Sequence, residues 1–246
     1  MKKFNFLVAA ITLFGSAAFF QSCDDDDDVD LRLPTAIVTV CPGEDGSFVM
    51  NLDNETVLQP TNMKKSPFGK KEVRALVNYT ETAASESKSV LRNVQVNWID
   101  SIRTKAPVHA TGIDDDEAFG NDPVEIVADW VTVAEDGYIT LRVRTLWGNS
   151  REPHVINLVT GVNPEDPYEM ELRHDAKGDV AGYMGDALIA FNLNDMPDLK
   201  DTVKIKLRWE SFSGEKTAEF DLKMRDKAET PSAAMLDNSL CGRSLE

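Results

Sequence analysis

The sequence predicts an all-β protein, with an OB-like small barrel followed by an antiparallel β-sandwich. Three observations predict this fold. Short runs rich in β-branched and aromatic residues recur along the chain, turn residues separate them about every ten to fifteen positions, and no long segment has the 3.6-residue apolar period of a helix. An acidic, glycine-containing break near residues 107–122 divides the runs into two series. A chain of 246 residues is long enough for two small domains.

The chain begins with the features of a secretory signal peptide. Lys2 and Lys3 precede an apolar run from Phe4 to Phe20, and Ser22 is a small residue before a predicted cleavage site. Cys23 follows that site directly, which resembles a bacterial lipobox, where the cysteine thiol receives a diacylglycerol. We therefore expect acylated Cys23 to anchor the protein to a lipid bilayer. The alternative is a plain signal peptide with an incidental cysteine.

Five consecutive aspartates follow Cys23 and predict a solvated, self-repelling tether for export to the surface. They are Asp24, Asp25, Asp26, Asp27 and Asp28. The formal net charge is −16, and removal of residues 1–22 takes away two lysines and no acid, which gives −18. So acidic a protein repels phosphate backbones, and no nucleic-acid partner is expected. No cofactor is expected either.

The first series of runs predicts the OB-like barrel. Asp53-Asn54-Glu55 separates two short runs as the turn of a hairpin does. In the last run Val94, Val96 and Trp98 alternate with polar residues, and the phase shifts at Ile99, as in a bent strand. The five predicted strands are 35–41, 47–53, 56–60, 72–80 and 90–102.

The second series predicts the sandwich. Asp136-Gly137 is the strongest short signal for a hairpin turn, and the run after it alternates apolar and polar residues from Ile139 to Arg144. Further runs with the same period of two follow, separated by turn residues. The complete predicted division is signal peptide 1–22, acidic tether 23–33, OB-like domain 34–108, acidic linker 109–121, β-sandwich 122–228 and tail 229–246.

Two cysteines remain once Cys23 is lipidated. Cys41 lies at the end of a predicted strand and Cys241 near the C-terminus. Export permits a disulfide between them, and two free thiols are the equal alternative. No Cys or His spacing predicts a zinc site.

Two features are candidates for ligand binding. Lys64, Lys65, Lys70 and Lys71, with Arg74, form the one basic stretch, in a predicted loop of the barrel. Such loops bind oligosaccharides or oligonucleotides in OB folds, and here an anionic glycan or a phosphate of lipopolysaccharide suits the charge better. The alternative is a solubilising loop. Trp147 precedes Gly148-Asn149 and is expected to be the most exposed tryptophan, as a sugar platform is.

Other polar clusters give weaker hypotheses. His174 with Asp175 is a potential base or metal ligand, although both residues are expected to fix a hairpin. The acids 114–117 and Asp122 could hold calcium, but a solvated loop is more usual. The sequence has no HExxH or GxSxG motif. We therefore expect no catalytic residues and no metal.

Several segments together resemble the NigD-like lipoproteins of Bacteroides and Prevotella. They are Cys23 with its aspartates, LDNETVLQP, RALVNYT, VQVNWIDSIRTK, GNDPVEIVADWV, PHVINLV and ELRHDAKGD. The resemblance implies an N-terminal OB-like domain, a C-terminal β-sandwich and no catalytic residues. The family name comes from a bacteriocin operon and an immunity role suggested there. We expect an outer-membrane lipoprotein, exposed at the cell surface, that binds a glycan or a protein, with bacteriocin immunity or envelope protection as the alternative.

Overall fold

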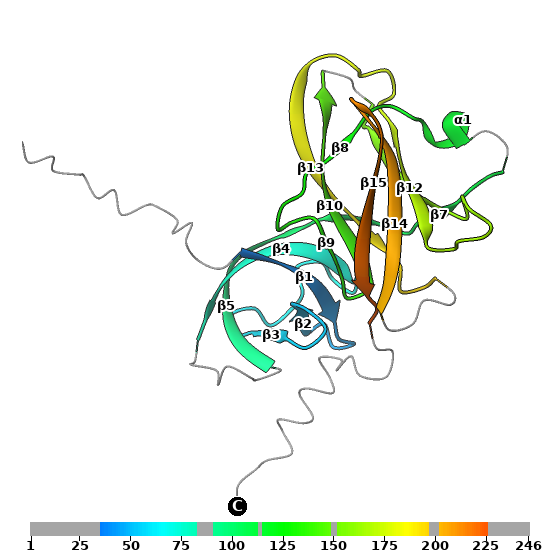
Figure 1. The fold of residues 1–246 in the computed structure, drawn as a ribbon. Coiled ribbons are helices and arrows are strands. Elements are labelled where there is room, and N and C mark those ends of the chain that lie inside the picture. The colour runs from blue at the N-terminus through cyan, green and yellow to red at the C-terminus, as the bar shows by residue number, and fades with distance from the viewer. Residues whose placement is uncertain (1–34, 83–90, 113–114, 149–151, 197–201, 226–246) are drawn as a thin grey trace, which may run out of the picture. The chain divides into compact units, whose positions relative to one another are not determined.

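The computed structural model describes residues 35–82, 91–112, 115–148, 152–196 and 202–225 (Figure 1). All of them belong to one compact unit, residues 33–246.

The predicted export features lie outside the described residues, so they stay predictions. These features are the signal peptide 1–22, the lipidation site Cys23 and the tether residues Asp24, Asp25, Asp26, Asp27 and Asp28. The predicted tail with Cys241 lies outside the described residues as well.

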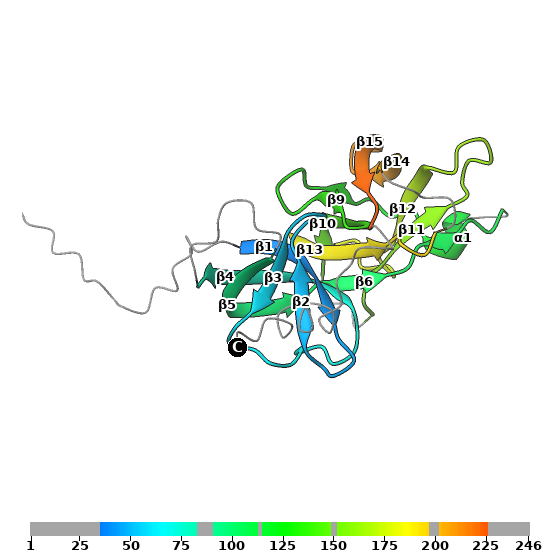
Figure 2. The ribbon, with the colours of Figure 1, turned by 90° about the horizontal axis from the view of Figure 1, so that it is seen from below.

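The first five strands form a closed barrel (Figure 2). They are β1 (Thr35–Pro42), β2 (Phe48–Asn51), β3 (Val57–Pro60), β4 (Val73–Glu81) and β5 (Leu91–Ser101). Their order around the barrel is β1-β2-β3-β5-β4, and β4 closes it by pairing with β1. The predicted hairpin is confirmed as the antiparallel β2–β3 pair, and β3 and β5 are parallel. Val38, Val40, Met50 and Leu58 are among the apolar residues that fill the interior.

A bulge in β5 changes which side chains of the strand point into the barrel, and it lies earlier in the strand than the sequence indicates. Asn78 pairs with Trp98, and the next residue of β4, Tyr79, pairs with Val96, so Asn97 is the extra residue. Val96 is consequently buried, whereas Trp98 is 36% exposed. The phase shift thus comes at Asn97 rather than at Ile99.

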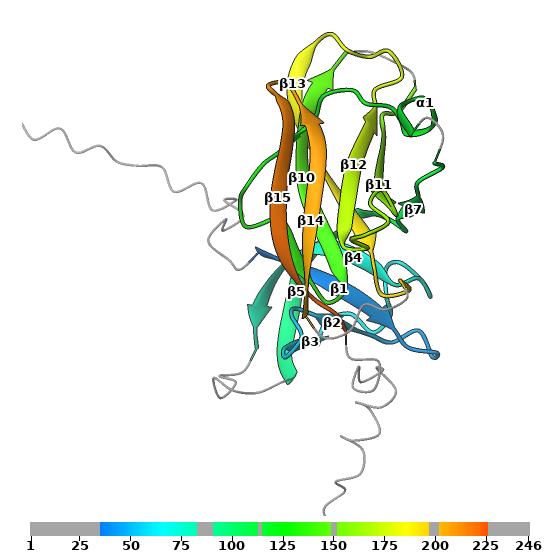
Figure 3. The same ribbon diagram turned by 45° about the vertical axis from the view of Figure 1, so that its right-hand side comes forward.

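The remaining strands form a sandwich of two sheets (Figure 3). They are β6 (Arg103–Lys105), β7 (Val108–His109), β8 (Glu125–Ile126), β9 (Val133–Glu135), β10 (Tyr138–Trp147), β11 (Val155–Thr160), β12 (Glu169–Asp175), β13 (Tyr183–Asn192), β14 (Thr202–Ser211) and β15 (Gly214–Lys223). One sheet, here called the β10 sheet, has the order β6-β13-β10-β8, with β9 also paired to β10. The other, the β14 sheet, has the order β15-β14-β12-β11-β7.

Alternating residues of both sheets build the sandwich core. Leu141 and Val143 of β10, Leu172 of β12 and Leu207 of β14 are buried in one apolar cluster. The period of two therefore places their polar sequence neighbours on the outer faces. The predicted Asp136-Gly137 hairpin is confirmed, since both residues have positive φ (51° and 73°) and Tyr138 pairs with Glu135.

The sandwich begins earlier in the chain than predicted. β6 and β7 both lie in or across the range 34–108 predicted for the barrel, yet β6 pairs with β13 and β7 with β11. Both pairs are parallel, as is β12 with β14, so the sandwich is not purely antiparallel. Short edge strands give little local signal, because their pairing partners lie far away in the sequence. The predicted linker 109–121 contains the short helix α1 (Asp115–Phe119).

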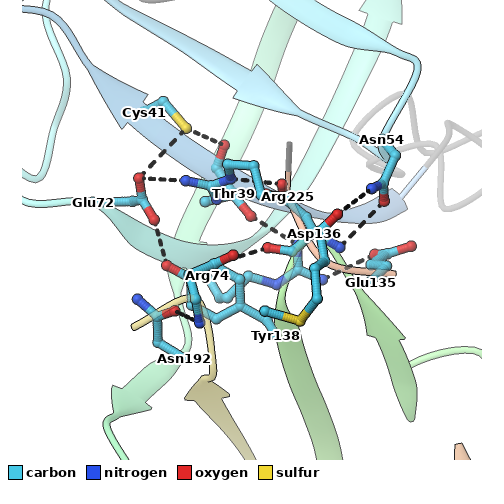
Figure 4. Close-up of polar contacts among 12 residues, drawn as sticks. Thr39, Cys41, Asn54, Glu72, Arg74, Glu135, Asp136, Tyr138, Asn192 and Arg225 are labelled. Atoms are coloured by element: carbon cyan, nitrogen blue, oxygen red, sulfur yellow. Dashed lines mark hydrogen bonds and ion pairs between the residues drawn. The ribbon is translucent and has the colours of Figure 1, made fainter. Parts of the chain in front are cut away.

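Barrel and sandwich share a partly buried polar cluster (Figure 4). Arg225 donates to both carboxylate oxygens of Asp136 at 2.7 Å and to Glu72 at 2.9 Å. Glu72 in turn accepts a 2.5 Å hydrogen bond from the Tyr138 hydroxyl. Arg74, grouped with the basic loop in the sequence, is instead fully buried in this cluster. An apolar cluster that includes Ile37 and Tyr138 adjoins it.

Candidate functional site

The basic stretch predicted from the sequence forms an exposed loop on the barrel between β3 and β4. Lys64, Lys65, Lys70 and Lys71 are all exposed, and together they are called the barrel rim here. Phe68 in the middle of the loop packs against the barrel core. This apolar contact holds the loop to the barrel while the lysine side chains extend into solvent.

A backbone hydrogen bond also joins the loop to the turn between β1 and β2, and further bonds order each of the two segments. The Ser66 amide donates to the Gly46 carbonyl at 3.0 Å, and the Phe68 amide donates to the Ser66 hydroxyl at 3.2 Å. Asp45 of that turn accepts from both the amide and the hydroxyl of Ser47. These bonds lower the pKa of Asp45, with a smaller contribution from nearby Lys65. The rim therefore combines a fixed backbone with long cationic side chains that reach into solvent.

The rim lysines differ from most other basic residues of the described chain. None of the four forms a salt bridge within the described residues. By contrast, eleven side chains are paired with carboxylates: Arg74, Arg92, Arg142, Arg144, Arg173, Lys177, Lys204, Lys206, Arg208, Lys216 and Arg225. On a chain with a net charge of −16, the rim is thus a local concentration of lysines outside the salt bridges of the described residues.

The prediction that Trp147 is exposed is wrong. Trp147 is half-buried, its indole Nε1 donates to the Gly185 carbonyl at 2.9 Å, and its ring stacks on His154 with centroids 4.3 Å apart. A Cβ at position 185 would lie 2.5 Å from the Trp147 ring, so Gly185 makes room for the indole. The tryptophans with exposed surface are Trp130, at 58%, and Trp98.

His174 is an internal hydrogen-bonding residue. It is 1% exposed, its Nδ1 lies 3.2 Å from the Pro123 carbonyl oxygen and its Nε2 lies 2.9 Å from His154 Nδ1. A carbonyl only accepts, so Nδ1 of His174 carries the proton and Nε2 accepts from His154. Burial and then the neighbouring His154 lower the pKa of His174. Both ring nitrogens are thus engaged.

The acidic residues near α1 have separate partners. Asp115 accepts from Thr111, Asp116 pairs with Arg173, and Asp122 accepts from the Ala176 amide at 2.7 Å. Asp175 accepts from the Lys177 amide, which closes the predicted turn. No three His, Cys, Asp or Glu side chains of the described ranges are placed to hold a metal ion.

Cys41 is largely buried and has no disulfide partner within the described residues. Its Sγ lies 3.7 Å from the Thr39 carbonyl and 3.8 Å from a carboxylate oxygen of Glu72. Burial, followed by the charge of Glu72, raises the pKa of this thiol to about 12. Its predicted partner Cys241 lies outside the described residues, so their pairing stays a prediction.

No helix within the described part of the chain is long and apolar enough to cross a membrane.

Solved structures with a similar fold come from species of Parabacteroides and Bacteroides. A protein described as toxin related from Parabacteroides distasonis is 28% identical, with 86% of this chain and 100% of that chain covered and a TM-score of 0.66. A NigD-like immunity protein from Bacteroides caccae is 22% identical over 77% and 92% of the chains, with a TM-score of 0.55. A protein described as a lipoprotein from Bacteroides fragilis is 14% identical over 79% and 100%, with a TM-score of 0.56. No protein of curated function matches.

Family comparisons agree with the two halves of the fold. Residues 37–102, which make up most of the barrel, match the NigD-like N-terminal OB domain. Residues 106–222, which make up most of the sandwich, match the NigD-like C-terminal beta sandwich domain. Because the two matches occur in the family's order and together span most of the chain, this protein belongs to the NigD-like family.

Proposed function

We propose that the protein is an exported lipoprotein that binds an anionic glycan at its barrel rim and catalyses no reaction. Acylated Cys23 anchors it in the outer membrane, facing outward, and the aspartate run holds the folded part away from the bilayer. The apolar segment before Cys23 supports this anchoring, as does the similarity to a B. fragilis protein described as a lipoprotein.

The observation that carries the binding proposal is the set of four unpaired lysines, among the described residues, on a loop fixed to an OB-like barrel. Loops of OB folds are common ligand sites. The rest of the protein is acidic, so a long polyanion such as a nucleic acid would meet repulsion beyond the rim. A short anionic segment, with uronate carboxylates or sugar phosphates, can contact the rim alone.

The engagement of the potential nucleophiles and bases supports a non-enzymatic role. The raised pKa keeps Cys41 protonated, and both nitrogens of His174 are hydrogen-bonded in the interior. Neither group is presented to a substrate.

Binding can be tested by calorimetry with three probes: oligogalacturonate for carboxylates, lipopolysaccharide for phosphates and dextran as a neutral glycan. The rim variant replaces Lys64, Lys65, Lys70 and Lys71 by Gln. A matched control replaces Lys177, Lys204, Lys216 and Lys223 by Gln, which makes the same change in net charge on the sandwich. We expect one anionic probe to bind the wild type and the control, and to bind the rim variant at least about tenfold more weakly. Equal binding to both variants would refute the rim as the site.

The anchor can be tested in the native host by mass spectrometry of the mature N-terminus. We expect a peptide that begins at Cys23 and carries acyl chains, and a Cys23→Ser variant that is absent from the membrane fraction. A mature protein with an unmodified N-terminus beyond Cys23 would contradict the anchor.

Bacteriocin immunity is the second candidate function. The shared fold with the NigD-like immunity protein of B. caccae favours it. A deletion strain and its complemented derivative can be compared for survival beside a bacteriocin-producing strain. Immunity predicts that only the deletion strain is killed, whereas equal survival would exclude this role against that bacteriocin.

A further inference from the structure

A cavity lies on the outer face of the β14 sheet. Its volume is about 250 Å³, and strands β12, β14 and β15 line it together with α1 and Asn121. The core residues Leu172 and Leu207 face inward, so their neighbours Glu171, Arg173 and Arg208 face this cavity.

A buried carboxylate organises the cavity wall. Glu171 is only 6% exposed and accepts a 2.7 Å hydrogen bond from Nε of Arg173. Its other oxygen pairs with Arg208, which is directly opposite in the parallel β12–β14 register. Arg173 also pairs with Asp116 of α1, and Arg208 also pairs with Glu215 of β15 at 3.2 Å. The ion pairs therefore fix both guanidinium groups in place.

Several polar groups of the wall form no hydrogen bond within the described residues. Nε of Arg208 is buried without a hydrogen-bond acceptor, and the carboxylate oxygen of Glu169 that pairs with it lies 4.0 Å away. The side chains of Glu210 and Asn121 form no hydrogen bond or salt bridge in the same part of the chain. Buried donors without acceptors are costly and uncommon, which makes them markers of a missing ligand or water.

The charges of the cavity determine which ligand class fits. Four carboxylates face two guanidiniums, so an anionic ligand would be repelled. A metal ion does not fit either. No three His, Cys, Asp or Glu side chains of the described residues lie close enough together to hold one. The groups that remain are a mixture of hydrogen-bond donors and acceptors. A hydroxyl group both donates and accepts, and therefore matches such a wall.

We infer that this cavity is a second ligand site, which binds one neutral sugar residue of a glycan. Its volume is below the roughly 300–1,000 Å³ of pockets that enclose drug-sized ligands, which suits a single sugar ring rather than a chain. The inference rests on the proposed glycan-binding function but names a different site with opposite charge preference. An anionic glycan that carries neutral residues could contact either site.

The test is saturation-transfer NMR and calorimetry on the mature chain with maltose, cellobiose, mannobiose, xylobiose and lactose, with digalacturonate as the anionic probe. The site variant is N121A combined with E210A, since neither side chain has a partner among the described residues whose loss would disturb folding. The controls are the rim variant and E165A, an exposed acid outside the cavity.

We expect at least one neutral disaccharide to bind the wild type, E165A and the rim variant alike, and to bind the N121A/E210A variant about tenfold more weakly or not at all. Equal binding to N121A/E210A would overturn the cavity as the site while leaving a glycan-binding function intact. No binding of any neutral disaccharide would also overturn the inference. If digalacturonate or lipopolysaccharide still binds through the rim, the proposed function survives the loss of this inference. If neither anionic probe binds, the proposed function is overturned as well.

Discussion

Arg74 of the barrel strand β4 donates a 2.9 Å hydrogen bond to the carboxylate of Glu135 in the sandwich strand β9 (Figure 4). Arg74 is completely buried, and its other nitrogens bond the hydroxyls of Thr39 in the barrel and Thr140 in the sandwich. Burial raises the pKa of Glu135, and Arg74 opposes that shift. One barrel side chain thus satisfies polar groups from both halves of the fold.

Loss of this guanidinium should destabilise the whole unit. Arg74→Met leaves the Glu135 carboxylate and two hydroxyls without their donor, and we expect a decrease of about 3 kcal/mol in the free energy of unfolding. The double variant with Glu135→Leu should recover part of that loss, because it removes the unpaired charge. Urea denaturation measures both, with the exposed Arg103→Met as control. A decrease of less than about 1 kcal/mol would show that the pair is not a structural junction.

The Cys41 thiol should be unreactive in the folded protein. Its pKa of about 12 leaves almost no thiolate at pH 8, and the thiolate is the species that reacts. In a protein with Cys23→Ser and Cys241→Ser, we expect alkylation by iodoacetamide only after denaturation. Alkylation of the native protein at the rate of a free cysteine would contradict the buried position of the thiol.

The stability of the fold should decrease on acidification through the histidine range. The folded state lowers the pKa of His174, so the unfolded chain binds a proton more readily than the folded chain does. Its contribution is therefore complete above the unfolded pKa of about 6.5 and is lost as the pH falls toward the lower folded pKa. Unfolding curves at pH 7.5, 6.5 and 5.5 should show this slope in the wild type and a smaller slope in His174→Gln. An identical slope in the variant would assign the effect to other groups.

Local patterns predict the strands well, because the period of two and the turn residues act over a few positions. The Asp136-Gly137 hairpin is the clearest case. The prediction for Trp147 is wrong although the sequence contains the signal, since Ile139, Leu141 and Val143 are buried and the same alternation places Trp147 inward. The following Gly148-Asn149 misleadingly indicates a loop. The period of two from Ile139 to Val143, continued to position 147, predicts the half-buried position of the indole ring.

The cavity beside α1 cannot be predicted in the same way. The sequence shows that Glu171 and Arg208 lie on outer faces, but not that β12 and β14 are parallel neighbours. The early start of the sandwich, at β6, also depends on a pairing between strands that are distant in the sequence. β6 is a strand because it pairs with β13, which lies far away in the sequence. A segment of three residues carries too little local pattern to predict such a long-range pairing.

The central claim is that the barrel rim binds an anionic glycan through its four lysines. The most direct test is the salt dependence of the dissociation constant for the anionic probe that binds best. As salt shortens the Debye length from about 10 to about 3 Å, the wild type should lose affinity steeply, because exposed charges are screened. The rim variant should bind weakly, with little dependence on salt, and the lysine control on the sandwich should follow the wild type. Wild-type affinity that stays constant across this range, or a rim variant with the same slope as the wild type, would contradict the claim.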